Sequence, residues 1–375
     1  MRVLAALSGG VDSSVAAAEL VAAGHEVVAV TMRLWGGPSD RGCCCSVSDV
    51  EDARRVAAQL GLEHHVFDFA EQFDAHVVEP YVQAHATGRT PNPCVECNRH
   101  LKFDALLERA DVLGFDAVAT GHHARIVEHE GRRHVARGSD AAKDQSYVLH
   151  PLVAPATERV LFPIGGLTKA EVRERATRLG LRTARKPDSQ DTCFITASGG
   201  RAAFLGPRTG LHPGEVVDVD GAPVGRVDAV ELVTIGQRRG LELAGGGGRR
   251  YVVDVDVPAR RVVVGPSEQL RRGSVALERV VWNGPVPTGA VDVQTSAHGT
   301  PAAAIVTGAD PVAGTAEVRW ERSRPRVAPG QSVVVYRGDV VLGGGVAASG
   351  PEPGPSAAAD ADPALLGDLE EPSGP

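Results

Sequence analysis

The first 200 residues alternate short apolar runs with helical stretches, and this alternation constrains the fold more than any other feature. Strands are predicted at Arg2–Leu7, His25–Met32, His64–Asp68 and Phe115–Ala119. Helices are predicted at Ser13–Ala23, Val50–Leu60 and Cys97–Ala110, in a stretch from residue 69 to about 86, and after the capping box that opens at Thr168. Strands and helices in this order predict an α/β fold, a parallel sheet covered by helices on both faces.

After about residue 200 the pattern changes to short Val-rich runs separated by turn pairs such as Asp220-Gly221 and Gly265-Pro266. Such spacing predicts two small all-β, barrel-like domains. From about residue 348 the chain is Pro, Gly, Ala and acid without an aromatic side chain, which is typical of a disordered tail. The predicted divisions are 1–200, 201–273, 274–347 and 348–375.

Composition excludes several classes of protein. No apolar run reaches the roughly 18–20 residues that span a bilayer, and the apolar start is a buried strand instead of a signal peptide, so we expect a cytoplasmic protein without a membrane partner. The six cysteines do not suggest a secreted disulfide framework in a chain of 375 residues. The net charge of −8 is no strong argument against RNA, because residues 348–375 hold six of the acids.

A nucleotide loop is predicted between the first strand and the first helix. Its two glycines, Gly9 and Gly10, let a backbone approach an anion closely, and the amides at the helix start point at such a ligand. The neighbouring serines are expected to cap the helix. Asp12 beside a phosphate site implies a bridging cation, so we predict Mg²⁺ there. The Walker pattern is absent.

Two polar loops present cysteines. Cys97 follows Thr90-Pro91-Asn92-Pro93-Cys94 and begins a predicted helix, where the helix dipole and Arg99 are expected to lower its pKa. Cys193 lies in a loop that begins at Lys186-Pro187. One thiol to hold sulfur and one to attack or resolve are the minimum for persulfide transfer.

The chain resembles one family closely from residue 1 to about 346, the bacterial tRNA-specific 2-thiouridylases within the PP-loop ATPases. The shared motifs are ALSGGVDSS, TPNPCVECNRHLKF, ATGHHAR, KDQSYVL, KPDSQDTCFI and PGQSVVVY. The resemblance implies a Rossmann-like PP-loop domain followed by two small all-β domains. It also implies an enzyme that adenylates C2 of the wobble uridine with ATP and exchanges the oxygen for sulfur.

The resemblance assigns roles to individual residues. Cys97 would be the catalytic cysteine and Cys193 the persulfide acceptor. ATP would contact the loop, the end of the second strand and the later ATGHH motif, through Ala6, Leu7, Ser8, Gly9, Gly10, Val11, Asp12, Ser13, Met32 and Gly121. The tRNA would contact Asn92, Pro93, Cys94, His122, Lys143, Asp144, Gln145 and Gln331. The persulfide would come from a donor such as a cysteine desulfurase or a sulfur carrier.

Some alternatives stay open. Cys94 stands where other members carry Asp, which creates a Cys-x-x-Cys pair with Cys97 and a second candidate thiol. Cys43-Cys44-Cys45 are either inert or part of a zinc or iron–sulfur site with that pair. Other functions remain: a PP-loop synthetase that forms amides on a small molecule, which needs no paired thiols, or a metal- or nucleotide-binding regulatory module.

Overall fold

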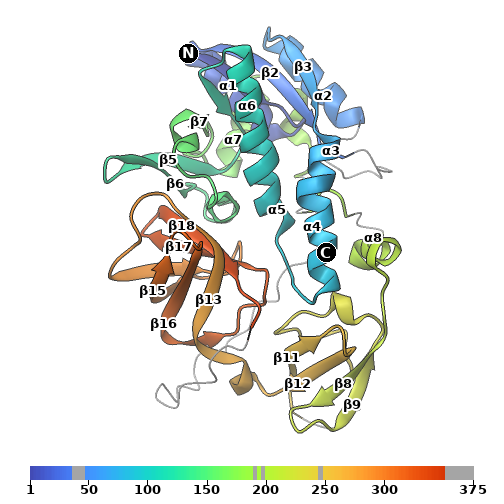
Figure 1. The fold of residues 1–375 in the computed structure, drawn as a ribbon. Helices are drawn as coiled ribbons and strands as arrows, with labels where there is room; N and C mark the ends of the chain where they lie inside the picture. The colour runs from blue at the N-terminus through green and yellow to red at the C-terminus, as the bar shows by residue number, and fades with distance from the viewer. Residues whose placement is uncertain (36–46, 189–191, 196–198, 244–247, 351–375) are drawn as a thin grey trace. The chain divides into compact units, whose positions relative to one another are not determined.

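The computed structural model describes residues 1–35, 47–188, 192–195, 199–243 and 248–350 (Figure 1). The chain forms two compact units. The first comprises Met1–Glu79, Pro93–Ser198 and Arg337–Leu342, and the second comprises Pro80–Asn92, Gly199–Tyr336 and Gly343–Pro375. The Cys43–Cys45 run and nearly all of the predicted acidic tail lie outside the described residues.

A five-stranded parallel sheet organises the first unit. Its strands are β1 (Arg2–Ala6), β2 (Glu26–Arg33), β3 (His64–Asp68), β4 (Ala117–Ala119) and β7 (Val160–Leu161). Their order is β3-β2-β1-β4-β7, and every pairing is parallel. The predicted Rossmann-like α/β fold is therefore confirmed for this part of the chain.

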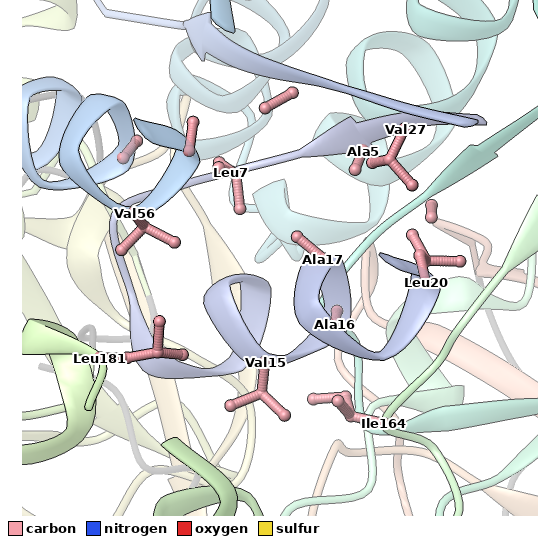
Figure 2. Packing of buried hydrophobic residues seen from close by; sticks show 14 of the residues in the cluster. Ala5, Leu7, Val15, Ala16, Ala17, Leu20, Val27, Val56, Ile164 and Leu181 are labelled. Carbon is pink, nitrogen blue, oxygen red and sulfur yellow. The ribbon is translucent and has the colours of Figure 1, made fainter. Parts of the chain in front are cut away.

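Helices pack against this sheet because small and branched apolar side chains interlock between them. Ala16, Ala17 and Leu20 of α1 (Val11–Ala22) are buried with Ala5 of β1 and Val27 of β2 (Figure 2). Val56 from α2 (Val47–Gln59) and Ala176 from α7 (Lys169–Arg178) belong to the same core. The alanines let the α1 backbone approach the strands closely, which fixes the loop that joins β1 to α1.

Two longer helical stretches follow, and the first of them passes from the first unit into the second at Pro80. One runs through α3 (Ala70–Phe73) and η1 (Asp74–Val78) into α4 (Glu79–Ala86), and the other through α5 (Pro93–Glu96), η2 (Cys97–Ala105) and α6 (Leu106–Leu113). The segments η1 and η2 are π-helical, a form that recurs at functional sites. The second stretch begins at Pro93, earlier than the predicted Cys97, because proline suits the first turn of a helix.

A hairpin of β5 (Ala124–His129) and β6 (Arg132–Arg137) follows β4 and was not predicted from the sequence. The first residues of β18 (Val340–Ala347) extend it, since Val340 pairs with Ala136. Charged side chains in both strands interrupt the alternation of apolar and polar residues that predicts a strand. The remaining short helices of this unit are η3 (Ser146–Leu149), η4 (Ala156–Arg159) and η5 (Arg182–Arg185).

The second unit is rich in β-structure, as the Val-rich runs predict. A first sheet has the order β10-β9-β8-β12-β11 and buries seven valines, among them Val216, Val252 and Val262. Its strands are β8 (Gly214–Asp218), β9 (Pro223–Val227), β10 (Glu242–Leu243), β11 (Tyr251–Asp256) and β12 (Arg261–Gly265). The helices α8 (Gly200–Thr209), η6 (Val230–Leu232) and η7 (Ser267–Leu270) flank these strands in sequence.

A second β-structure in this unit closes on itself. Its strands are β13 (Arg271–Trp282), β14 (Ala290–Gln294), β15 (Ala302–Asp310), β16 (Thr315–Pro325), β17 (Ser332–Arg337) and the end of β18. The strands neighbour one another in the order β13-β16-β15-β14-β17-β18, and β13 also pairs with β18. That last pairing leaves a barrel without open edges.

Candidate active site

The loops that follow β1 and β4 meet at one edge of the parallel sheet. These strands are neighbours, and the strand order reverses between them, so their carboxyl ends flank the crevice where open α/β sheets bind ligands. The loop after β1 holds Leu7–Gly10, and the loop after β4 holds Thr120–His123. The sequence-predicted nucleotide loop and the ATGHH motif are thus brought together.

Two glycines allow the backbones here to touch. Gly9 has a positive φ of 74°, and a Cβ on it would lie 2.3 Å from the carbonyl oxygen of Asp49. A Cβ on Gly121 would lie 2.5 Å from the backbone nitrogen of Ser13. Neither position has room for a side chain, which accounts physically for both glycines in the motifs.

The serines of the loop do not cap the helix as predicted. The residue that precedes α1 is Gly10, and no side chain caps this end. Instead the Ser14 hydroxyl donates to the Gly10 carbonyl at 2.6 Å, and the backbone N–H of Ser8 donates to Oγ of Ser13 at 3.1 Å. The serines therefore tighten the loop onto itself, and the amides at the start of α1 are not taken up by a side-chain cap.

Asp12 lies in the first turn of α1 and is held by two basic side chains. The ammonium of Lys169 lies 2.8 and 2.7 Å from its two carboxylate oxygens, and Nε2 of His123 lies 3.2 Å from one of them. Burial alone would raise the pKa of Asp12, but the hydrogen bonds from His123 and Lys169 outweigh it and hold the pKa below its usual value. The carboxylate is therefore ionised at neutral pH.

Lys169 is a site residue that the sequence analysis missed. Its position was interpreted only as part of a helix capping box, and this box does form between Thr168 and Glu171. The same box places Lys169 at the first helical position, from which its side chain reaches both Asp12 and Asp188. A signal was present, since the chain has only four lysines among its 39 basic residues and the other three lie in or beside motifs.

The loop that carries Cys193 is tied to the nucleotide loop through its first residues. The Lys186 ammonium donates to the Gly9 carbonyl at 2.9 Å and forms ion pairs with Asp49 at 2.6 Å and Asp52 at 2.8 Å. These acids raise the pKa of Lys186 although burial opposes them. The start of the cysteine loop therefore lies directly against the backbone of the predicted ATP site.

Asp188, two residues further along, collects three cations. Its carboxylate lies 2.9 Å from Lys143, 2.9 Å from Lys169 and 2.7 Å from Arg173. Burial would raise the pKa of Asp188, but Lys143 and Lys169 drive it far below its usual value. Asp188 stays ionised throughout the physiological range.

An aromatic contact holds the other side of Cys193. Phe194 is buried, and its ring centroid lies 5.7 Å from that of Phe73 and 6.2 Å from that of Trp35. Phe73 ends α3, and the following π-helical segment η1 stacks His76 on His100 of η2 at 4.8 Å. The stretch from α3 into η1 thus contacts the residue after Cys193 through Phe73 and the helix of Cys97 through His76.

Cys97 is buried, and its pKa is raised by that burial, only partly offset by the charge of Lys102. The prediction of a lowered pKa is therefore wrong. The helix begins four residues earlier, at Pro93, so the thiol lies in the second turn, where the dipole has faded. The cation that acts on the thiol is Lys102 and not Arg99. Cys94, Cys97 and Cys193 are all free thiols.

The residues predicted to contact tRNA have varied surroundings. Asp144 is buried, and its carboxylate accepts hydrogen bonds from Arg137, from the Gly138 N–H and from the backbone and side chain of Ser146. Gln145 accepts from the His123 N–H at 2.9 Å. Lys143 is the most exposed of this trio and reaches Asp188. Their contacts with tRNA stay a prediction.

His122 lies in an apolar setting. Its ring packs against those of Phe103 and Phe162, which also contact each other, and its Nδ1 lies 2.7 Å from the Thr120 hydroxyl. Burial lowers the pKa of His122 well below its usual value, with Lys102 and His123 adding to the effect. The imidazole is therefore neutral, able to donate or accept one hydrogen bond but not to attract phosphate by charge.

The remaining predicted residues lie around these loops. Met32 is half-buried near the end of β2. Asn92 directly precedes Pro93 and Cys94, which open α5. In the second unit, Nε2 of Gln331 donates to the Thr90 carbonyl at 2.5 Å, so this side chain contacts the segment that directly precedes Asn92. Among the described residues, no three His, Cys, Asp or Glu side chains form a metal-binding group.

Comparison with known proteins identifies the family. Family models match residues 1–197, described as a tRNA methyl transferase HUP domain, residues 202–266, a tRNA methyl transferase PRC-barrel domain, and residues 272–347, an aminomethyltransferase β-barrel domain. A tRNA-specific 2-thiouridylase from Mycobacteroides abscessus is 48% identical over 361 residues, covering 92% of this chain and 99% of the relative. This chain belongs to the tRNA-specific 2-thiouridylase family.

Other relatives agree with this membership. The 2-thiouridylase of Kineococcus radiotolerans is 48% identical over 359 residues, covering 92% of this chain and 97% of its own. That of Thermobifida fusca is 46% identical over 351 residues, with 92% and 94% covered. The family predicted from the sequence motifs is therefore confirmed. No helix in the described ranges combines the length and apolar character needed to cross a membrane.

Proposed function

We propose that the chain is an ATP-dependent tRNA-uridine 2-sulfurtransferase that converts the wobble uridine of tRNA to 2-thiouridine. The observation that carries the proposal is the attachment of the Cys193 loop to the nucleotide loop, through Lys186 on the Gly9 carbonyl. A thiol loop bound to a nucleotide loop suits an enzyme that must activate a base and deliver sulfur at one place. The names of the relatives support the same activity.

The first step would use the loop from Ala6 to Ser13. Backbone amides at the start of α1 would receive the phosphates, and Gly9 and Gly121 leave space for close approach. The uridine C2 oxygen would attack the α-phosphorus of ATP, with pyrophosphate leaving. C2 then carries an AMP ester, which is a good leaving group.

Mg²⁺ fits the donor chemistry at Asp12. An ionised carboxylate beside a phosphate loop is the hard oxygen ligand that this ion prefers, but the ammonium of Lys169 contacts both oxygens, so the ion would have to use their other lone pairs or displace that ammonium. Bound there, the ion would supply charge neutralisation for the polyphosphate. Lys169 and Lys186 would add positive charge from the protein itself.

The second step would use the two thiols. A persulfide on Cys193 would attack C2 through its terminal sulfur, with AMP leaving and taking the original oxygen. Attack of the Cys97 thiolate on the Cys193 sulfur would then break the S–S bond to the product, leaving sulfur on C2 and a Cys97–Cys193 disulfide. Alternatively Cys97 first reduces the persulfide and releases sulfide, which attacks C2. Both routes end in the same disulfide, which a two-electron reductant must reopen.

Further parts of the proposal concern partners. The tRNA would be contacted by Asn92, Pro93, Cys94, His122, the Lys143–Gln145 segment and Gln331. The sulfur would come from a persulfide donor such as a cysteine desulfurase or a sulfur carrier, and the reaction would take place in the cytoplasm. The net charge of the chain is −8, so tRNA binding would rely on local basic residues.

Single-turnover thiolation with a preloaded persulfide tests the proposal. Cys97→Ser and Cys193→Ser should each lose turnover, because each removes one end of the disulfide. Cys94→Ser, the matched control three residues from Cys97, should keep most of it. Peptide mapping without reductant should find the Cys97–Cys193 link after wild-type turnover. An active Cys193→Ser variant would favour the amide-forming synthetase, and an active Cys97→Ser with a dead Cys94→Ser would reverse the two roles.

A further inference from the structure

One ammonium group is shared by two carboxylates from different functional segments. Lys169 lies 2.7 Å from Asp12 in the nucleotide loop and 2.9 Å from Asp188 in the Cys193 loop. The Lys169 side chain is 13% exposed, so water screens these contacts weakly. Lys169 therefore links the nucleotide loop and the start of the Cys193 loop through one charged group.

Asp188 is the last charged residue before Cys193 in the part of the chain that the structure describes. The two residues are five positions apart, so the chain between them spans at most about 17 Å. On the far side, Phe194 is fixed among aromatic rings of Phe73 and Trp35. Asp188 is therefore held by ion pairs and Phe194 by aromatic contacts, and the ion pair of Asp188 with Lys169 leads on to Asp12 in the nucleotide loop.

The partners of Asp188 do more than neutralise it. Arg173 also donates to the carbonyls of Ala184 and Lys186 at 3.0 Å each, so it braces the backbone that enters the loop. Lys143 comes from the segment predicted to meet tRNA. Asp188 thus joins the entry to the thiol loop, the predicted tRNA segment and the Asp12 site at one carboxylate.

We propose that Asp188 is a positioning residue for sulfur transfer: through Lys169 it holds the Cys193 loop at a fixed place beside the nucleotide loop. The inference rests on the proposed function, because it takes Cys193 as the sulfur carrier. Asp188 contacts neither substrate nor sulfur in this role. It sets where the persulfide lies relative to the base activated next to Asp12.

The first test needs no catalysis. Iodoacetamide alkylation of the unliganded protein is followed by peptide mass spectrometry, and the measured quantity is the rate at Cys193 divided by the rate at Cys97. Asp188→Asn keeps the shape and removes the charge, so the ratio should rise several-fold as the loop loosens. Cys97 is buried and reacts quickly only if the chain unfolds, so the ratio separates loop release from misfolding. An unchanged ratio overturns the proposal.

Asp140→Asn is the matched control. Asp140 also lies beside Lys169, but its two carboxylate oxygens accept from the backbone N–H groups of Lys169 and Ala142, one each, so Asp140→Asn removes the same charge as Asp188→Asn while its amide oxygen keeps one of these hydrogen bonds. This variant should behave like wild type. Asp188→Glu restores the charge at the end of a longer chain and should recover part of the wild-type ratio. An effect of Asp140→Asn equal to that of Asp188→Asn would overturn the specific role of Asp188.

The second test measures the two steps of the reaction, AMP formation and sulfur transfer, separately. With Asp188→Asn, AMP formation on tRNA should stay close to wild type, while transfer from preloaded Cys193 should fall by about tenfold or more, since misplacement of a reacting group by about 1 Å has costs of that order. Equal losses in both steps would show a general defect and overturn the positioning role. Cys193→Ser, run in parallel, must abolish transfer; if it does not, the proposed function fails and not the role of Asp188 alone.

Discussion

A thiol expected to be reactive is the least accessible of the three described cysteines. Cys97 is 7% exposed, whereas Cys94 and Cys193 are intermediate in exposure. Burial disfavours the thiolate because the charge loses its hydration, and Lys102 does not make up the difference. A protonated, enclosed thiol is expected to oxidise slowly in this conformation.

The first residue-scale prediction follows from this burial. In the folded, unliganded protein, alkylation of Cys97 should still be increasing above pH 9, since its pKa lies above the ordinary value of 9.0. The measurement is the pH dependence of iodoacetamide labelling at the Cys97 peptide. The control is the same peptide in urea, where the half-maximum should return to about the ordinary thiol value. A folded-state midpoint at or below the urea midpoint would contradict the assignment.

His85 provides a second residue-scale prediction, in the second unit. Its ring is 2% exposed, Nδ1 lies 3.2 Å from the Glu231 carbonyl, and burial lowers its pKa from 6.5 to about 4. The unfolded chain therefore binds the proton more readily, so stability is complete above pH 6.5 and falls as the pH drops towards 4. The loss over this window should be about 2–3 kcal/mol.

Chemical denaturation between pH 7 and 4 measures the effect. His85→Gln should flatten the pH dependence in this window, because no group with a displaced pKa remains at that position. His298→Gln, which changes an exposed histidine in the same unit, should leave the wild-type slope in place. If stability depended on pH with the same slope in His85→Gln and His298→Gln, a group other than His85 would be responsible for the pH dependence.

At the scale of elements, the join between β4 and α1 depends on one missing side chain. Gly121→Ala would bring a Cβ within 2.5 Å of the Ser13 nitrogen and 2.7 Å of the Asp12 carbonyl carbon, which are backbone atoms without freedom to move aside. We expect a loss of about 1–3 kcal/mol in the free energy of unfolding, together with weaker ATP binding because the loop is displaced. Urea denaturation and nucleotide titration measure the two effects.

Gly166→Ala is the control for this prediction. Gly166 lies in the same unit with nothing within 4 Å of an added Cβ and no positive φ. Its free energy of unfolding and its ATP affinity should match wild type. If Gly121→Ala behaves in the same way, the two loops do not pack as closely as described.

Elements with strong periodicity could be predicted, and those with mixed patterns could not. His64–Asp68 matches β3 residue for residue, and Arg2–Leu7 differs from β1 by one residue at its end. The β5–β6 hairpin was missed because adjacent charged residues such as Arg132 and Arg133 interrupt the alternation of apolar and polar residues from which a strand is predicted. The start of α5 was missed because Pro93 was interpreted as a stiff approach and not as a first helical residue.

At the scale of the whole molecule, the sequence motifs predicted which segments form the candidate site but not the ion pairs that join them. The predicted nucleotide loop, the ATGHH motif and the residues Lys186 and Asp188 lie close to one another. The ion pairs of Lys169 and Asp188 were not predictable, because they join residues that are far apart in the chain and that follow no periodic pattern. The pKa of Cys97 was predicted in the wrong direction, because sequence shows a nearby helix end but not the depth of burial.

The scarcity of lysine gives the molecule an unusual chemical selectivity. Its four lysines all belong to the first unit: three form ion pairs around the nucleotide and Cys193 loops, and the fourth influences Cys97. A reagent that acylates primary amines leaves the guanidinium groups elsewhere untouched, so apart from the chain terminus it has targets only at this site. The ion pairs keep these ammonium groups protonated, since Asp188 raises the pKa of Lys143 and the acids Asp49 and Asp52 raise that of Lys186 against burial, so acylation should be slow while the pairs are intact, and faster labelling would report that they have broken.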